Sequence, residues 1–136
     1  MRTTKTTKKS FAPYIKNLFL ELRRRKITTL KNPSIEFELF PNEKLRTLKK
    51  QYLKKDVEIV DVLSFPSKDF PDPEAGSGYL GEIYINEDIA RDDINRAMFL
   101  LVHGVLHLLG YRHEQKRDIM IMEKLEQELC AMLLSR

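Results

Sequence analysis

The chain has little cysteine and no long apolar run, and each shortage excludes a class of protein. Its 136 residues include a single cysteine, so no disulfide can form within the chain and a reducing cytoplasm is the expected compartment. The best apolar run, residues 97–109, contains two histidines and a glycine and falls short of the roughly 20 residues that span a membrane. We therefore expect one cytoplasmic domain without membrane contact.

The N-terminal segment lacks both an apolar core and acidic side chains. Without an apolar core it is not a secretory signal. Its lack of acids is shared with organellar transit peptides, but arginine is sparse in this segment. We predict a basic disordered tail over residues 1–10, followed by a single domain over residues 11–136.

Acidic residues are also scarce in the first 55 positions. Sixteen Lys and Arg stand against four Glu there, whereas residues 56–136 carry eight basic and sixteen acidic side chains. A basic region of this density suits the phosphate backbone of a nucleic acid, because each neutralised phosphate releases counterions. The alternative interpretation is a solvated charged surface. We favour contact with a nucleic acid.

Hydrophobic periodicity indicates an α+β domain, in which about four helices pack against one small sheet of three to four strands. Apolar residues repeat at helical spacing in four segments, residues 11–26, 42–54, 92–109 and 116–134. Alternating or continuous apolar residues predict strands at residues 34–40, 58–65 and 79–86, and the second should be buried more fully than the first. Three prolines and two glycines make residues 66–78 a loop.

All three histidines of the chain lie in one eleven-residue window with the spacing H-x3-H-x5-H. His103 and His107 are one helical turn apart and can offer ring nitrogens to one ion. Gly110 can end the helix in a left-handed conformation, which lets the chain bring His113 to the same ion. Three protein ligands leave a tetrahedral zinc ion one position for water, as in catalytic zinc sites.

The residues around the histidines limit which reactions the site could catalyse. Helical zinc proteases carry a glutamate directly after the first histidine, whereas Gly104 stands here and would leave room for a bulky substrate group. Glu114 is a candidate general base, although we favour a role as a cap of the last helix. Nickel, copper and iron also accept three histidines. We expect one Zn²⁺ ion, because no redox partner is evident.

These segments resemble the YbeY family of ribosomal-RNA maturation endoribonucleases. The family signature HGxLHLxGYDH corresponds to HGVLHLLGYRH here, and the family segments TDVLSFP and LGDIxI correspond to VDVLSFP and LGEIYI. The resemblance implies a small mixed sheet with the metal at the end of the central helix, and zinc ligands His103, His107 and His113. It also implies cleavage of a small-subunit rRNA precursor by metal-bound water, with the ribosome or its assembly factors as partners.

Two of the departures from the family pattern bear on phosphate binding. Leu53 stands where an LNxxYR segment would place an arginine that handles phosphate, and Lys54 or Lys55 is the candidate substitute. Arg112 replaces the acid before the last histidine of the motif, and we hypothesise that it binds the scissile phosphate. The missing arginine leaves open a non-catalytic, zinc-stabilised RNA- or ribosome-binding protein. Gly104 and the basic half of the chain weaken a third alternative, a zinc peptidase or amidohydrolase.

Overall fold

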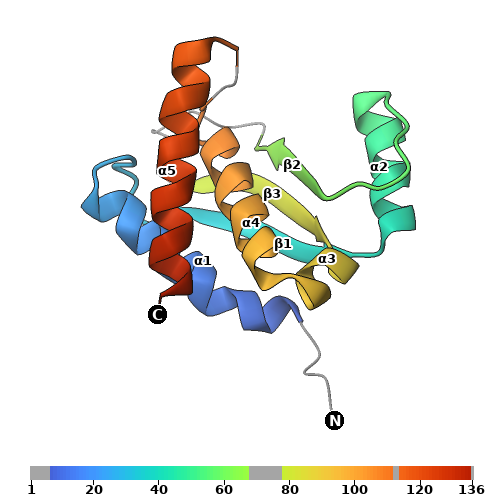
Figure 1. Cartoon of the computed structure of the whole chain (residues 1–136), viewed down its shortest axis with the longest axis horizontal. Helices are drawn as coiled ribbons and strands as arrows, with labels where there is room; N and C mark the ends of the chain where they lie inside the picture. The colour runs from blue at the N-terminus through green and yellow to red at the C-terminus, as the bar shows by residue number, and fades with distance from the viewer. Residues whose placement is uncertain (1–6, 68–77, 112–113, 136) are drawn as a thin grey trace.

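A three-stranded mixed sheet organises the fold, which a computed structural model describes for residues 7–67, 78–111 and 114–135. The central strand is β3 (Tyr79–Asn86), which pairs in parallel with β1 (Ser34–Phe40) and antiparallel with β2 (Val62–Pro66). The helices are α1 (Lys8–Arg24), α2 (Asn42–Leu53), α3 (Glu87–Asp92), α4 (Ile94–Leu108) and α5 (Lys116–Leu134) (Figure 1). The predicted α+β class with a small mixed sheet is confirmed.

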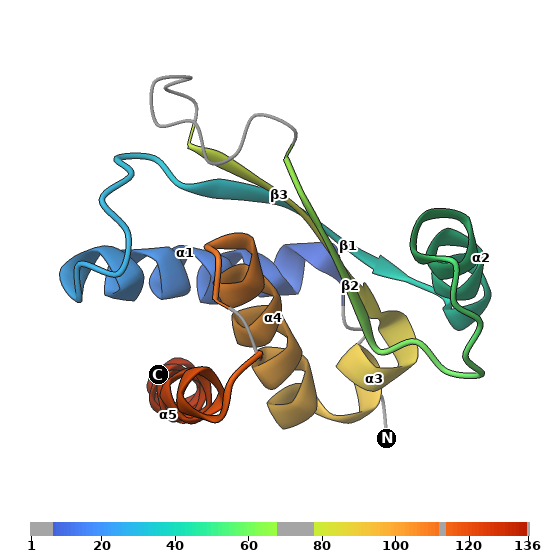
Figure 2. The ribbon, with the colours of Figure 1, turned by 90° about the horizontal axis from the view of Figure 1, so that it is seen from above.

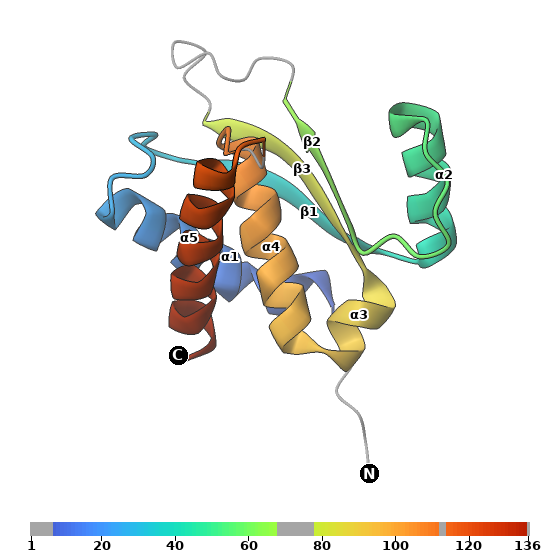
Figure 3. The ribbon, with the colours of Figure 1, turned by 45° about the horizontal axis from the view of Figure 1, so that its top comes forward.

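The two faces of the sheet carry different layers. Ile83 and Ile85 of β3 pack into the main core with α1, α4 and α5, and α5 lies alongside α4 (Figure 1). Tyr84, between them in sequence, points to the other face and packs with Leu45 and Leu63 in a second cluster. Figures 2 and 3 show α2 on this second face, separated by the sheet from the other long helices.

The first helix begins earlier than its sequence predicts. Thr7 is the N-cap residue, and Lys8, Lys9 and Ser10 belong to α1 rather than to a tail. The hydroxyl of Ser10 donates to the carbonyl of Thr7. Phe11 is fully buried and stacks on Phe37 with ring centroids 4.8 Å apart, so packing on the sheet holds this first turn in place. Residues 1–6 lie outside the described residues.

The second predicted strand is shorter than expected. β2 begins at Val62 and lies at the sheet edge, and Ile59 is 66% exposed. Before β2, side chains take the place of the hydrogen bonds of a neighbouring strand. Asn42 Oδ1 accepts from the Val60 amide at 2.8 Å, and Asn86 Nδ2 donates to the Val60 carbonyl at 3.1 Å. Because its amide and its carbonyl are already satisfied, Val60 needs no strand partner.

The helix predicted over residues 92–109 begins at Ile94, and a short helix that was not predicted, α3, precedes it. Asp93 has φ −146° and ψ 89°, which breaks the helical path, and its side chain accepts from the Arg96 amide to cap α4. Asn86 caps the preceding α3 in the same way, through the amides of Asp88 and Ile89. The helix count is therefore five in the part of the chain that the structure describes. In that same part, no helix combines the length and apolar character needed to cross a bilayer.

A buried carboxylate links α1 to the C-terminal helix. Glu21 accepts hydrogen bonds from Arg24 at 2.5 Å and Arg25 at 2.7 Å, and Arg25 also binds Glu128 of α5 at 2.6 Å. These hydrogen bonds, that of Arg24 first, lower the pKa of Glu21 to about 2, against the opposing effect of burial. The two guanidinium groups thus keep Glu21 ionised across the range in which ordinary carboxyl groups titrate.

Glu21→Gln is expected to lower the free energy of unfolding at neutral pH by about 1–2 kcal/mol, the range for hydrogen bonds to charged groups after screening by water. The pKa of Glu21 is lower in the folded chain, so its contribution is complete above the unfolded pKa near 4.5 and is lost as the pH falls towards 2. Urea unfolding from pH 7 to pH 3 measures this. The difference between the two proteins should shrink with acid, and a difference constant with pH would contradict this expectation.

Candidate metal centre

The helix α4 runs through the core and places two histidines one turn apart near its C-terminal end. The Nε2 atoms of His103 and His107 lie 2.9 Å apart, and the rings meet edge to face with centroids 4.4 Å apart. Both side chains are partly buried, while their neighbours on α4 are fully buried. Two imidazole nitrogens that converge in this way fit the shared coordination of a metal ion.

A carboxylate from α5 binds the His103 ring at the nitrogen that does not face His107. Oε2 of Glu126 lies 2.5 Å from Nδ1 of His103, and Glu126 is only 2% exposed. A carboxylate can only accept, so Nδ1 carries the proton and Nε2 keeps the lone pair that a metal needs. Phe99, one turn before His103 on α4, stacks on the same ring with centroids 5.6 Å apart. These contacts fit a metal ligand, whose second nitrogen is normally held by a carboxylate or carbonyl.

The role of Glu126 was not predicted from the sequence, although the sequence carries a signal for it. Glu126 stands on the apolar face of α5, four residues after Met122 and three before Leu129, which are both fully buried. An acid in the middle of an apolar helical stripe is unfavourable without a partner. That pattern could have identified a functional residue, but it could not have identified the partner.

The chain turns away from α4 at a glycine, as predicted. Gly110 has φ +101°, and its amide donates to the carbonyl of His107, while the Tyr111 amide donates to that of Leu106. This pattern closes the helix and redirects the chain. The two residues that follow, Arg112 and His113, lie outside the described residues. The predicted third ligand and the predicted phosphate-binding arginine therefore stay predictions.

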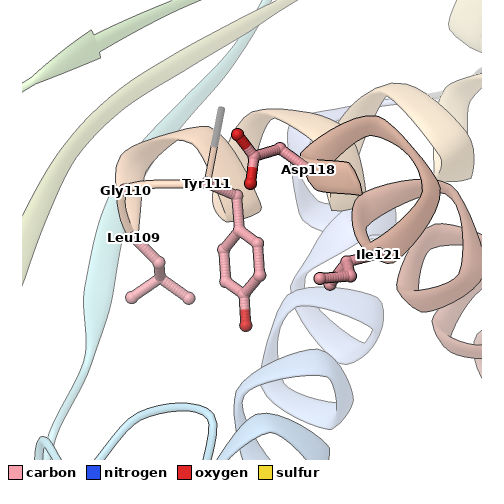
Figure 4. Close-up of a pocket in the computed structure, with 5 residues that line it drawn as sticks. All are labelled: Leu109, Gly110, Tyr111, Asp118 and Ile121. Atoms are coloured by element: carbon pink, nitrogen blue, oxygen red, sulfur yellow. The ribbon is translucent and has the colours of Figure 1, made fainter. Parts of the chain in front are cut away.

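Two hollows flank this end of α4. One, of about 340 Å³, is lined by Gly110, Tyr111 and Asp118, and Figure 4 shows the Tyr111 ring between Leu109 and Ile121. The second, of about 510 Å³, lies between α4 and α5 and includes residues His103, Glu126 and Cys130 in its lining. Burial raises the pKa of the Cys130 thiol to about 11, so it stays protonated and is not a nucleophile.

Comparison with known proteins shows which family the chain resembles in sequence. The sequence model of the family described as Endoribonuclease YbeY matches residues 2–134. The chain belongs to the YbeY family. A Thermotoga maritima protein solved in solution has the same fold as this YbeY-family chain, with a TM-score of 0.51, 23% sequence identity, and coverage of 91% of this chain and 86% of the other.

Curated relatives named Endoribonuclease YbeY show the same similarity. The Neorickettsia sennetsu protein is 32% identical over 129 residues, which cover 88% of this chain and 87% of that protein. The Carboxydothermus hydrogenoformans protein is 34% identical over 107 residues, covering 73% and 71% respectively. The Myxococcus xanthus protein is 35% identical over 108 residues, 74% of this chain, but this chain spans only 36% of that longer relative.

The glycine in the YbeY-family histidine motif does not have the role that its sequence suggested. Gly104 is buried, and a Cβ added to it would lie 3.1 Å from Cδ1 of Ile83 on β3. The missing side chain therefore allows close packing of α4 on the sheet and does not open space beside the histidine pair. The prediction of room for a bulky group is wrong, because residue 104 points to the sheet face.

The remaining predicted site residues lie apart from the histidine pair or at its margin. Lys54 has φ +56° as the C-cap of α2, on the sheet face opposite to α4, and its Nζ donates to the Gln51 carbonyl at 3.0 Å. Glu114 is exposed and precedes Gln115, the N-cap residue of α5, so the cap is one residue later than predicted. Leu53, at the position of the family arginine, is 45% exposed at the end of α2.

Proposed function

We propose that this YbeY-family chain is a zinc-dependent endoribonuclease that cleaves a small-subunit rRNA precursor in the cytoplasm, with the ribosome or its assembly factors as partners. The observation that carries the proposal is the convergence of His103 Nε2 and His107 Nε2, with Glu126 fixing the orientation of the first ring. His113 is the proposed third ligand. A zinc ion held there would supply a Lewis acid and a water molecule with a pKa of about 7.

The basic half of the chain supports RNA as the substrate. The exposed cations of this half include Arg23 and Arg24 of α1 and Lys44 and Lys50 of α2, and further basic residues follow α2. Their summed field attracts a polyanion and raises the association rate. Arg112 is the proposed contact to the scissile phosphate, because a guanidinium can bind phosphate oxygens in bidentate geometry.

One observation favours a second candidate, a zinc-stabilised RNA-binding protein without catalysis. Leu53 cannot bind phosphate, and α2 holds it on the sheet face opposite to α4. A peptidase receives no such support. The general base of helical zinc proteases follows the first histidine, and residue 104 here faces β3.

Removal and return of metal test the proposed nuclease. A chelator-treated protein should cleave a structured RNA with single-stranded loops at least about 100-fold more slowly than the zinc-loaded protein, because the ion supplies several kcal/mol of transition-state stabilisation. Stoichiometric Zn²⁺ should restore the rate. Cleavage that persists at full rate without metal would refute zinc dependence, whereas tight RNA binding without cleavage at any metal would establish the second candidate.

A further inference from the structure

The carboxylate of Glu126 is buried at a cost in folding free energy, so its presence at this position needs an explanation. Removing a carboxylate from water costs several kcal/mol even after the protein relaxes. The neighbouring buried positions on α5, Met122, Leu129 and Leu133, carry apolar side chains that pack into the main core. An apolar residue at position 126 would pack the same interface without that cost. Helix packing alone therefore does not account for Glu126.

We propose that Glu126 is a positioning residue that selects the metal-binding form of His103. Its Oε2 accepts the proton of His103 Nδ1 at 2.5 Å, which fixes the tautomer and leaves the Nε2 lone pair directed at His107 Nε2. Without this acceptor the ring can place its proton on Nε2 or rotate, and both changes remove a ligand. The inference rests on the metal site of the proposed function, but not on RNA cleavage.

Glu126 is held rigidly enough to direct a ring on another helix. It stands near the middle of α5, between the buried Met122 and Leu129, and Glu128 two residues later binds Arg25 of α1 at 2.6 Å. The stacked Phe99 of α4 also limits movement of the His103 ring. The imidazole is therefore fixed by contacts from both α4 and α5.

The chain offers a matched control on the same helix. Glu123 lines the same hollow between α4 and α5, three residues before Glu126, but it is exposed. Glu123→Gln removes the same charge from nearly the same place and leaves the contact with His103 in place. A general electrostatic effect on the ion would change both variants equally, whereas positioning predicts an effect of Glu126→Gln alone.

Zinc affinity, measured by competition with a chromophoric chelator on the full chain, is the main test. Glu126→Gln is expected to weaken Zn²⁺ binding by roughly 10–100-fold, as for other partners of metal-bound histidines. Glu123→Gln should leave affinity within about twofold, consistent with the small energies of exposed charges. Equal affinity of wild type and Glu126→Gln would overturn the proposal. If Glu126→Gln does not fold by circular dichroism, Glu126→Asp, which shortens the reach by one methylene, should show the same loss of affinity.

A second readout requires no metal. Nitrogen-15 NMR of the metal-free wild type at pH 8 should show His103 protonated on Nδ1, and Glu126→Gln should show a mixture of tautomers. Protonation on Nε2 in the wild type would overturn the inference even if no ion binds. Zinc binding that depends on Glu126 but comes without RNA cleavage would refute the proposed nuclease and leave the positioning role intact.

Discussion

Replacing His107 by alanine is expected to reduce both zinc occupancy and RNA cleavage to near background. The ring supplies one of the two converging Nε2 atoms, and its loss leaves the ion with incomplete protein coordination. A loss of about 4 kcal/mol of transition-state stabilisation corresponds to a rate about 1,000-fold lower. Single-turnover cleavage of a labelled RNA and metal analysis of the purified variant measure the two effects together.

The folded state should survive this change, which makes the result interpretable. His107 is partly buried and lies near the C-terminal end of α4, while the fully buried residues of this helix remain. Circular dichroism should therefore match that of metal-free wild type. Because the ligands act as a unit, a double variant of His103 and His107 should be no slower than either single variant. Retained cleavage in His107→Ala with a full zinc complement would contradict the assignment of this ligand.

The elements with a clear period were predictable from the sequence. Strands Ser34–Phe40 and Tyr79–Asn86 and the helix Lys116–Leu134 have the predicted bounds, because their apolar residues repeat with periods of 2 and 3.6. The convergence of His103 and His107 followed from the same helical geometry. Spacing along one helix is a local property, and local properties are readable from sequence.

Features that depend on contacts between distant segments were missed. Glu126 meets His103 across 23 residues, and Asn86 bonds Val60 and Asn42 across 26 and 44 residues. The Asn42 side chain likewise forms hydrogen bonds with the carbonyl of Glu58 and the amide of Val60. A polar side chain at such a position shows only that a partner is needed. The identity of the partner requires the fold.

Replacing Gly104 by glutamate would write the His-Glu-x-x-His pattern of zinc peptidases into the chain, and we expect unfolding instead of peptidase activity. Its Cβ would lie 3.1 Å from Cδ1 of Ile83, and the carboxylate would be forced against the sheet. Overpacking typically costs about 1–3 kcal/mol, and an unpaired buried charge adds several more. Together these costs approach the whole stability of an ordinary domain, about 5–15 kcal/mol. Circular dichroism and urea unfolding measure the loss, and a folded variant that cleaves peptides would contradict the placement of residue 104.

A double-mutant cycle with smaller substitutions tests whether the contact between residue 104 and Ile83 explains the glycine. Gly104→Ala gains about 1 kcal/mol of helix propensity but brings its methyl group against Ile83, so the net change should be small. Ile83→Val removes Cδ1, the closest atom, and alone costs about 0.5–1.5 kcal/mol. In the valine background Gly104→Ala should become stabilising, because the nearest remaining Ile83 side-chain atom is 3.4 Å away. Strictly additive changes in the free energy of unfolding would show that close packing of α4 on β3 does not explain the glycine.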